Sequence, residues 1–336
     1  MKKNRGWKKL IHARRSARRN LRRKRQNRAY LSGERRLKEK VPVSAPNYKA
    51  SGVVRRETIQ LPSNFSFVNE PKLVLKAFAQ FRIFAQQRRN VLIDFRAVKT
   101  MTHDVIPFLL AKVSKYGRVI SIHSNRTSVP IIDDLLLESG FYKAVGVTDY
   151  QSNSGLTDTH KNKIVDTEIA QKARILTSTK TFGDSNIKIQ ALYRTIIECM
   201  ANTNKHAYID GPSQKWWLSV YYNPETRITS FAFCDTGVGI FKSANLEKWS
   251  KVAIKIGLTS NRSILQKILT GQISSSTGLP YRGKGLPKIF SDYKANKLQR
   301  LCIAANDTFA DYNNGTFVDL KDELNGTFLY WEIWPN

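Results

Sequence analysis

Three polar residues follow one another at intervals of four within residues 192–207, LYRTIIECMANTNKHA. On a helix, Glu198, Asn202 and His206 would each be rotated by only about 40° from the previous one, so they would form one polar stripe. A carboxylate, an amide and an imidazole in a row could bind a ligand, although any surface helix carries a polar stripe. The apolar residues Ile189, Tyr193, Ile196 and Met200 recur at helical spacing and predict the face that meets a core.

A second segment, CDTGVGI at residues 234–240, follows two predicted strands at 216–222 and 228–234. Asp235 ends the second strand, and Gly237 and Gly239 would let a ligand approach the backbone while the carboxylate accepts its hydrogen bond. Two alternatives stay open. A tight turn capped by Asp235 would look the same, and an aspartic protease would need a second carboxylate from a homodimer, because D-T-G occurs once.

A third segment, STGLPYRGKGL at residues 276–286, has the G-x-x-x-x-G-K spacing of a phosphate-binding loop through Gly278, Gly283 and Lys284. Gly285 stands where a Ser or Thr would hold magnesium, so the match to that loop fails. A helix is predicted at 287–295, and glycines before a helix expose N–H groups that suit phosphate. Arg282 and Lys284 would add positive charge there.

The last segment is NGTFLYWEIWP at residues 325–335, an alternating strand opened by Gly326 and Thr327. In this order the four segments resemble the GHKL ATPase superfamily, which includes gyrase, MutL, Hsp-type chaperones and histidine kinases. The resemblance covers residues 165–336 and is closest to the anti-sigma-factor serine kinases. It implies a Bergerat-type α/β sandwich with a mixed sheet, and ATP and Mg²⁺ as cofactors.

The resemblance also implies a role for each residue. Asn202 would bind the magnesium ion, Glu198 would orient or deprotonate the attacking water or hydroxyl, and Asp235 would accept from the adenine amino group. Gly237 and Gly239 would make room for the base, and a lid would lie within residues 241–281. The other nucleotide-binding residues implied are His206, Ile240, Arg282, Gly283, Lys284, Gly285, Leu286 and Thr327.

Residues 51–148 have an α/β pattern of their own. Strands are predicted at 57–62, 90–95 and 119–124, and helices at 71–88, 105–115 and 130–138. The segments NVLIDFRAVKTMTHDVIPFLL and LLLESGFYKAVG resemble the STAS domain, the fold of anti-sigma-factor antagonists. In that family a serine near this turn is phosphorylated, and Thr102 is the candidate here, while Asp94 is expected to brace the turn. The polar residues 149–164 are predicted to be a linker.

The net charge of +30 is concentrated at the N-terminus. Residues 1–40 contain 18 Lys or Arg and two Glu, a net of +16. Together with a linker they form a basic segment at residues 1–50, for which nucleic acid or another polyanion is the expected partner. No apolar run approaches the roughly 20 residues that span a bilayer, and three scattered cysteines favour buried thiols in a cytoplasmic protein.

Three functions are compatible with the sequence. The leading hypothesis is a Mg-dependent ATPase switch that regulates a partner, which binds through the STAS-like domain, or a bound polyanion. The alternatives are a serine/threonine kinase of the anti-sigma type and a nucleic-acid-binding module with nucleotide as a ligand only. An autophosphorylating histidine kinase is disfavoured, because no helix pair with a phosphoacceptor histidine is found, and a homodimer stays open.

Overall fold

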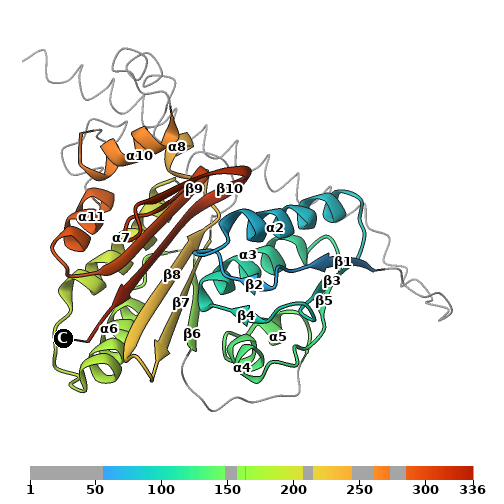
Figure 1. Cartoon of the computed structure of the whole chain (residues 1–336), viewed down its shortest axis with the longest axis horizontal. Helices are drawn as coiled ribbons and strands as arrows, with labels where there is room; N and C mark the ends of the chain where they lie inside the picture. The colour runs from blue at the N-terminus through green and yellow to red at the C-terminus, as the bar shows by residue number, and fades with distance from the viewer. Residues whose placement is uncertain are drawn as a thin grey trace, which may run out of the picture. The chain divides into compact units, whose positions relative to one another are not determined.

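The computed structural model describes residues 56–147, 157–162, 164–206, 215–243, 260–272 and 285–335, without the side chains of residues 204–206, 242, 243 and 323. Residues 54–336 form one compact unit. The basic segment at residues 1–40, predicted to bind a polyanion, lies outside the described residues. The architecture is mixed α/β, as the sequence predicts (Figure 1).

Residues 56–147, called the N-terminal region below, contain a small parallel sheet in the order β1-β3-β5, with helices around it (Figure 1). The central strand reads VLID and is largely buried, as expected of a parallel strand covered on both faces. The predicted strands and helices are confirmed, with ends shifted by up to three residues. The elements are β1 (Glu57–Gln60), β2 (Asn64–Phe65), α2 (Pro71–Gln86), β3 (Val91–Asp94), β4 (Thr100–Met101), the 3-10 turn η1 (His103–Val105), α3 (Ile106–Tyr116), β5 (Ile122–Ser124), α4 (Pro130–Glu138) and α5 (Phe141–Ala144).

The central sheet has the order β6-β7-β8-β10-β9, and each of its described pairings is antiparallel. The mixed sheet that the GHKL resemblance implies is therefore not found among the described strands. Hairpins account for two of these four pairings, because β7–β8 and β9–β10 follow each other directly and a short turn can join only antiparallel strands. The strands are β6 (Thr157–Asn162), β7 (Trp216–Asn223), β8 (Ile228–Asp235), β9 (Gln299–Asp311) and β10 (Thr316–Ile333).

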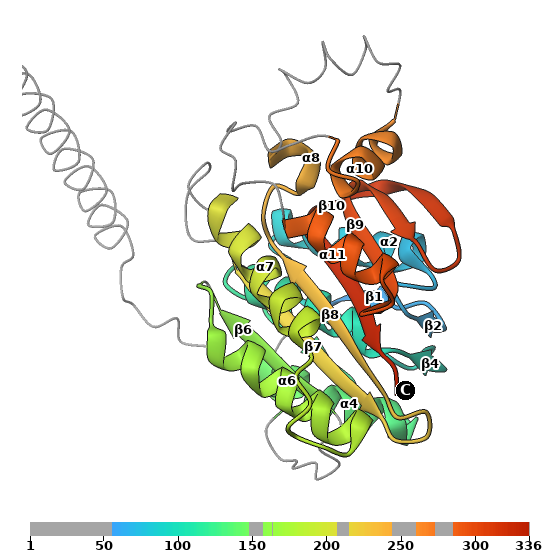
Figure 2. The ribbon, with the colours of Figure 1, turned by 90° about the vertical axis from the view of Figure 1, so that its left-hand side faces the viewer.

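Helices cover one face of the central sheet (Figure 2). Alternate strand residues such as Phe231 and Phe233 point into this layer, where they pack with Ile196 and Met200 of α7. Asp166 caps α6 by accepting from two backbone N–H groups, and Gly183 ends it in a left-handed conformation. The helices are α6 (Thr167–Phe182), α7 (Gln190–His206), α8 (Ile240–Ser243), α10 (Asn261–Leu269) and α11 (Gly285–Lys294).

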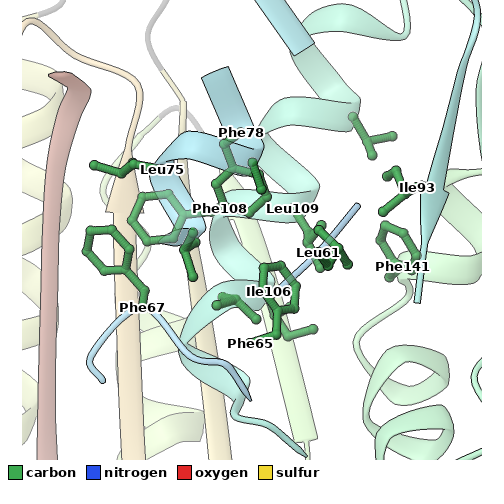
Figure 3. Packing of buried hydrophobic residues seen from close by; sticks show 14 of the residues in the cluster. Leu61, Phe65, Phe67, Leu75, Phe78, Ile93, Ile106, Phe108, Leu109 and Phe141 are labelled. Carbon is green, nitrogen blue, oxygen red and sulfur yellow. The ribbon is translucent and has the colours of Figure 1, made fainter. Parts of the chain in front are cut away.

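The N-terminal region covers the opposite face. The strand residues between those that face the helices, such as Ala232 and Cys234, belong to the same buried cluster as the aromatic rings of the N-terminal region. Phe67 contacts Phe328 of β10 at a ring-centroid distance of 4.8 Å, and Phe108 stacks on the same ring at 5.1 Å. Figure 3 shows Phe67 and Phe108 in the apolar layer that joins α2 and α3 to the sheet.

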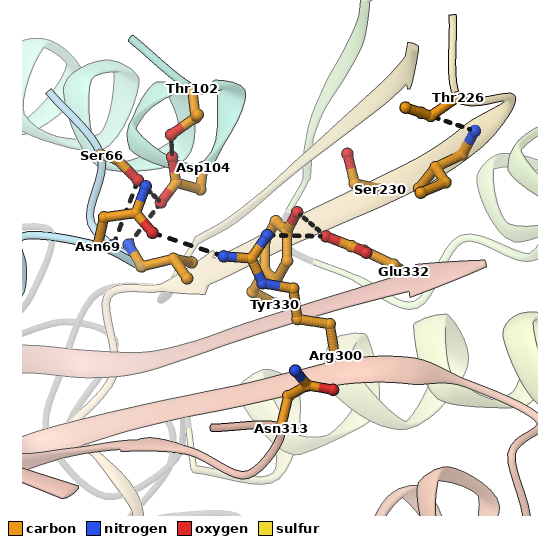
Figure 4. A network of polar contacts seen from close by, with 12 residues as sticks. Ser66, Asn69, Thr102, Asp104, Thr226, Ser230, Arg300, Asn313, Tyr330 and Glu332 are labelled. Carbon is orange, nitrogen blue, oxygen red and sulfur yellow. Dashed lines mark hydrogen bonds and ion pairs between the residues drawn. The ribbon is translucent and has the colours of Figure 1, made fainter. Parts of the chain in front are cut away.

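Polar contacts also join the N-terminal region to the sheet. His103 is buried, with Nδ1 3.2 Å from the Ser219 hydroxyl of β7 and Nε2 2.8 Å from the Ser230 hydroxyl of β8. Burial lowers the pKa of His103 to about 3, so the ring is neutral. Arg300 of β9 binds Glu332 at 3.3 Å and reaches Asn69 at 3.5 Å (Figure 4).

The prediction of a linker at residues 149–164 is wrong in part, because residues 157–162 form the edge strand β6. The sequence TDTHKN has no apolar residue, so it lacks the alternation of apolar and polar residues that predicts a strand. An edge strand tolerates such a sequence, since only one of its sides is hydrogen-bonded and its side chains are only partly buried.

Candidate functional site

Helix α7 carries the predicted polar stripe next to its buried face. Glu198 and Asn202 are partly exposed, whereas Ile196, Cys199 and Met200 are buried. His206 is the last residue of α7, and its side chain lies outside the described residues. The two described side chains of this stripe, Glu198 and Asn202, are therefore accessible to a ligand.

Asp235 ends β8 and is held by backbone groups from two segments. Its Oδ1 accepts from the Gly237 N–H at 2.8 Å and from the Thr327 N–H at 3.1 Å. The carboxyl group is buried, and this burial raises its pKa to about 6, although the hydrogen bonds act in the opposite direction. The Asp235 carboxylate thus links residues 235–237 to β10.

Gly326 allows this close approach. Its φ is +116°, and a Cβ placed there would lie 2.0 Å from the Asp235 carbonyl oxygen. The pairing of β9 with β10 shifts register between Leu324 and Thr327, so a local irregularity brings this part of β10 toward Asp235. Only glycine fits both the backbone angle and the space.

Asn306 of β9 packs against Gly239, the second glycine of residues 234–240. The sequence patterns did not predict this role for Asn306. Its side chain accepts from the Phe241 N–H at 3.3 Å and donates to the Val238 carbonyl at 3.0 Å. Gly239 has a φ of +83°, and a Cβ there would lie 2.5 Å from the Asn306 side chain. Ile240 follows at the start of α8 and is buried in the helical layer. A lone Asn in a strand gives no signal of this role in the sequence.

Gly285 brings the third segment to α7. A Cβ on Gly285 would lie 2.4 Å from Glu198 Oε2 and 3.6 Å from Asn202 Nδ2. Gly285 is separated from these two residues by more than 80 positions in the sequence, yet the first residue of α11 lies against the polar stripe of α7. A bulkier residue than glycine would fill the space over Glu198.

An ion pair fixes α11 against α7. The Arg194 guanidinium of α7 donates to Asp292 of α11 at 2.7 Å, and Lys288 lies 3.1 Å from the same carboxyl group. Burial acts to raise the pKa of Asp292, but the two cations outweigh it and hold that pKa below its usual value. The sequence alone does not indicate this pair, because its partners lie 98 residues apart.

Two unusual residues of the predicted site fit the structure without strain. Thr203, beside Asn202, is buried and donates its hydroxyl hydrogen to the Cys199 carbonyl at 3.2 Å. Pro287 is the third residue of α11, within the first turn, where a helix needs no N–H donor. Leu286 packs partly buried against the helical core. Neither Thr203 nor Pro287 disturbs its helix.

Part of the predicted site lies outside the described residues. This applies to Arg282, Gly283 and Lys284, and to most of the predicted lid at 241–281, of which residues 241–243 and 260–272 are described. The residues that the structure does bring together come from four distant segments. They are Glu198 and Asn202 with Gly285, and Asp235 with Gly237, Gly326 and Thr327.

The other predictions concern residues away from this site. Asp94 braces its turn as expected, with its carboxylate bound by Arg96 and Asn125. Thr102 is exposed and donates its hydroxyl hydrogen to the buried carboxyl group of Asp104. The three cysteines are buried and form no disulfide, and no described helix has the length and apolar character to span a membrane.

The chain was compared with models of known protein families and with curated protein sequences, and it matched none of them. A function must therefore be inferred from the geometry of the residues described above.

Proposed function

We propose that the chain is an ATP-binding protein of the GHKL type and works as a Mg-dependent ATPase switch. The observation that carries the proposal is that the four segments linked by the sequence order contact one another in two groups. Gly285 lies against Glu198 and Asn202, while Thr327 and Gly237 bind Asp235. In each of these two groups, residues from segments far apart in the sequence lie in contact.

Asp235 supports binding of the adenine base. Both described backbone donors bind Oδ1, and the neighbouring Gly237 has no side chain that would exclude a flat ring. A buried carboxylate that is bound by N–H groups, with no described cation beside it, favours a partner with an N–H to donate. The exocyclic amino group of adenine is such a donor.

Glu198, Asn202 and the start of α11 support binding of the phosphates. The N-terminus of α11 provides unpaired N–H groups, and the predicted residues Arg282 and Lys284 directly precede it in sequence. The Asn202 amide fits magnesium, because Mg²⁺ is usually bound by one or two protein oxygens together with phosphate oxygens. The described residues contain no group of three acidic, His or Cys side chains that could hold a metal. When bound, the ion would neutralise phosphate charge.

Glu198 supports a reaction in addition to binding. Its carboxylate lies one helical turn from Asn202 and beside Gly285, so it faces the place proposed for the terminal phosphate. A glutamate there can orient a water molecule and accept its proton. Binding alone would not need this carboxylate.

The N-terminal region supports the switch part of the proposal. Its parallel strands and flanking helices agree with a STAS-like fold, and it packs on the sheet face opposite to α7. ATP binding would change the contacts of β8 and β10, which carry Asp235 and Thr327 and also contact the N-terminal region. A protein partner, a homodimer and a cytoplasmic location remain parts of this proposal, as does a polyanion bound to residues 1–40.

Replacement of Glu198 tests the proposal. Glu198→Gln should lower ATP turnover by about 10²–10⁴-fold while ATP binding is retained, because the acceptor of the water proton is lost. Glu168→Gln, which changes an exposed glutamate at the start of α6, is the matched control and should turn over ATP normally. Wild-type turnover in Glu198→Gln would contradict the assignment of this residue.

Labelled ATP separates the ATPase from the serine/threonine kinase. With a γ-labelled nucleotide, an ATPase releases all label as free phosphate, whereas a kinase transfers it to a protein hydroxyl group. Nucleic-acid binding that weakens with salt and does not depend on ATP, without ATP turnover, would favour a nucleic-acid-binding module.

A further inference from the structure

A groove of about 830 Å³ lies between the N-terminal region and the edge of the central sheet. One wall is formed by the end of α3, the turn at Gly117, β5 and α5, and the other by β6 and β7. Its volume is within the range of roughly 300–1,000 Å³ that is typical of ligand sites. The proposed nucleotide site does not use any of its residues.

The groove is separate from the nucleotide site because it opens on the other face of the sheet. Trp216 and Leu218 of β7 point into the helical core that carries α7, so Trp217, between them, points to the opposite face. Lys161 of β6 pairs with Trp217, and both line the groove. A ligand in the groove would therefore contact the N-terminal region rather than α7.

The charge of the groove is entirely positive. Arg118, Lys143 and Lys161 line it, and no Asp or Glu is among the lining residues. None of these three cations forms an ion pair with a described residue, although each is exposed. Some other exposed arginines of the N-terminal region have acidic partners, as in the pairs Arg89–Glu57 and Arg126–Asp133, whereas Arg82 and Arg88 form no ion pair with a described residue. The groove thus concentrates unneutralised charge.

Hydroxyl groups lie between these cations. Thr159, on β6, has a buried Oγ1 with no hydrogen-bond partner among the described residues. Ser114 accepts from the Lys215 ammonium group at 3.4 Å, so a fourth cation lies at the edge of the groove. Buried hydroxyl groups without partners are rare because they lose their hydrogen bonds to water. A bound oxyanion would satisfy the Thr159 hydroxyl.

We propose that this groove binds a phosphate ester, with the charge held by Arg118, Lys143 and Lys161 and an oxygen accepting from Thr159. Three cations without an acidic neighbour favour a ligand with more than one negative charge, and guanidinium can bind two phosphate oxygens at once. The phosphate is either that of a free nucleotide or that of a nucleic-acid strand. The site goes beyond the proposed ATPase function and does not depend on it.

Acylation of lysines in the full chain, followed by mass spectrometry, tests the location. The probes are thymidine 5′-monophosphate and a 12-residue oligothymidylate, with thymidine as the control that lacks phosphate. Thymine also lacks the adenine amino group that Asp235 is proposed to bind, so the ATP site does not interfere. Acylation of Lys143 and Lys161 should slow several-fold with a phosphate-bearing probe and remain unchanged with thymidine, while Lys72 and Lys297 react at the same rate throughout.

Protection by the mononucleotide would assign a free nucleotide, and protection by the oligonucleotide alone would assign a strand. The triple variant R118Q/K143Q/K161Q should bind the protecting probe about tenfold more weakly or worse. The variant K72Q/R82Q/K297Q removes the same charge from exposed cations outside the groove and should keep the wild-type affinity. Circular dichroism melting curves check that both variants fold. Absence of protection at Lys143 and Lys161, or equal loss of affinity in both variants, would overturn the proposal.

Discussion

Asp94 and Asp235 occupy similar places in two different regions, and their surroundings differ. Each aspartate ends a strand, each is buried, and each binds a backbone N–H two residues further along the chain. Around Asp94, the Arg96 guanidinium binds both carboxylate oxygens and Asn125 binds one of them, which holds its pKa well below the usual range. Around Asp235, burial dominates and raises the pKa to about 6.

Under the proposed function, this comparison separates a structural carboxylate from one that binds a ligand. The oxygens of Asp94 are occupied by its own protein, so this residue closes a turn. Asp235 accepts from the N–H groups of Gly237 and Thr327 and from the Thr327 side chain, and no ion pair with a described cation neutralises it. The proposed function therefore assigns adenine binding to the aspartate that has no cation beside it, and a structural role to the aspartate that has one.

The largest expected effect is at Gly326, which permits the close approach of β10 to Asp235. Gly326→Ala should lower the free energy of unfolding by about 3 kcal/mol or more, because its Cβ would collide with the Asp235 carbonyl at a φ of +116°. Gly315→Ala is the matched control, since φ is +63° and the space around it is open, and should cost about 1–2 kcal/mol. Urea denaturation measures both values, and equal losses would contradict the role of Gly326.

Exchange of each aspartate for asparagine should separate their roles. Asp235→Asn should weaken ATP binding about 100-fold, or about 2.7 kcal/mol, while the fold is kept, because a buried charge is removed. Asp94→Asn should leave ATP affinity unchanged and lower the melting temperature, since its contacts with Arg96 are lost. Isothermal titration and thermal melts of both variants check this. If Asp94→Asn impaired ATP binding as strongly, the comparison would fail.

The pKa of Asp235 predicts how ATP affinity depends on pH. The amino group of adenine needs an ionised acceptor, and in the free protein this carboxyl group is protonated below its pKa of about 6. Affinity should thus be constant above pH 7 and fall about tenfold by pH 5. Titrations of wild type and Asp235→Asn between pH 5 and 8 test this, and parallel curves for the two proteins would exclude Asp235 as the titrating group.

A smaller effect of pH, on the free energy of unfolding, is expected from His103 of the N-terminal region. Its folded pKa of about 3 lies below the unfolded value of about 6.5, so only the unfolded chain takes up a proton between these values. Stability from this group is complete above pH 6.5 and is lost as pH falls, by about 1 kcal/mol between pH 7 and 5.5. Urea denaturation of wild type and His103→Gln should show a smaller slope in the variant, and identical slopes would refute the assignment.

Local patterns predicted the parts of the fold that local forces determine. Helix α7, the β7–β8 hairpin and the helix that begins at Gly285 each follow from periodicity or turn residues within a short segment. The order of motifs was enough to expect Glu198, Asn202 and Gly285 in one site. Such features depend on neighbours in the chain, which a single sequence records.

Features that depend on distant partners could not be predicted. Asn306 acts on Val238 and Phe241 from about 65 positions away, and nothing about an Asn in a strand indicates which loop it binds. Strand β6 is stabilised by pairing with β7 and has no apolar pattern of its own. The contact between Phe67 and Phe328 could not be predicted either, because a sequence does not show which aromatic residues of two distant segments pack together.

The shared core also has a consequence for synthesis on the ribosome. The aromatic rings of α2, α3 and the preceding loop are covered by β10, which is made after the other described strands. At roughly 5–20 residues per second, the nascent N-terminal region would wait roughly 10–40 s for this strand, with its apolar surface open to water. Chains truncated before β10 should therefore be bound by chaperones or degraded, even though their first 147 residues contain a complete parallel sheet.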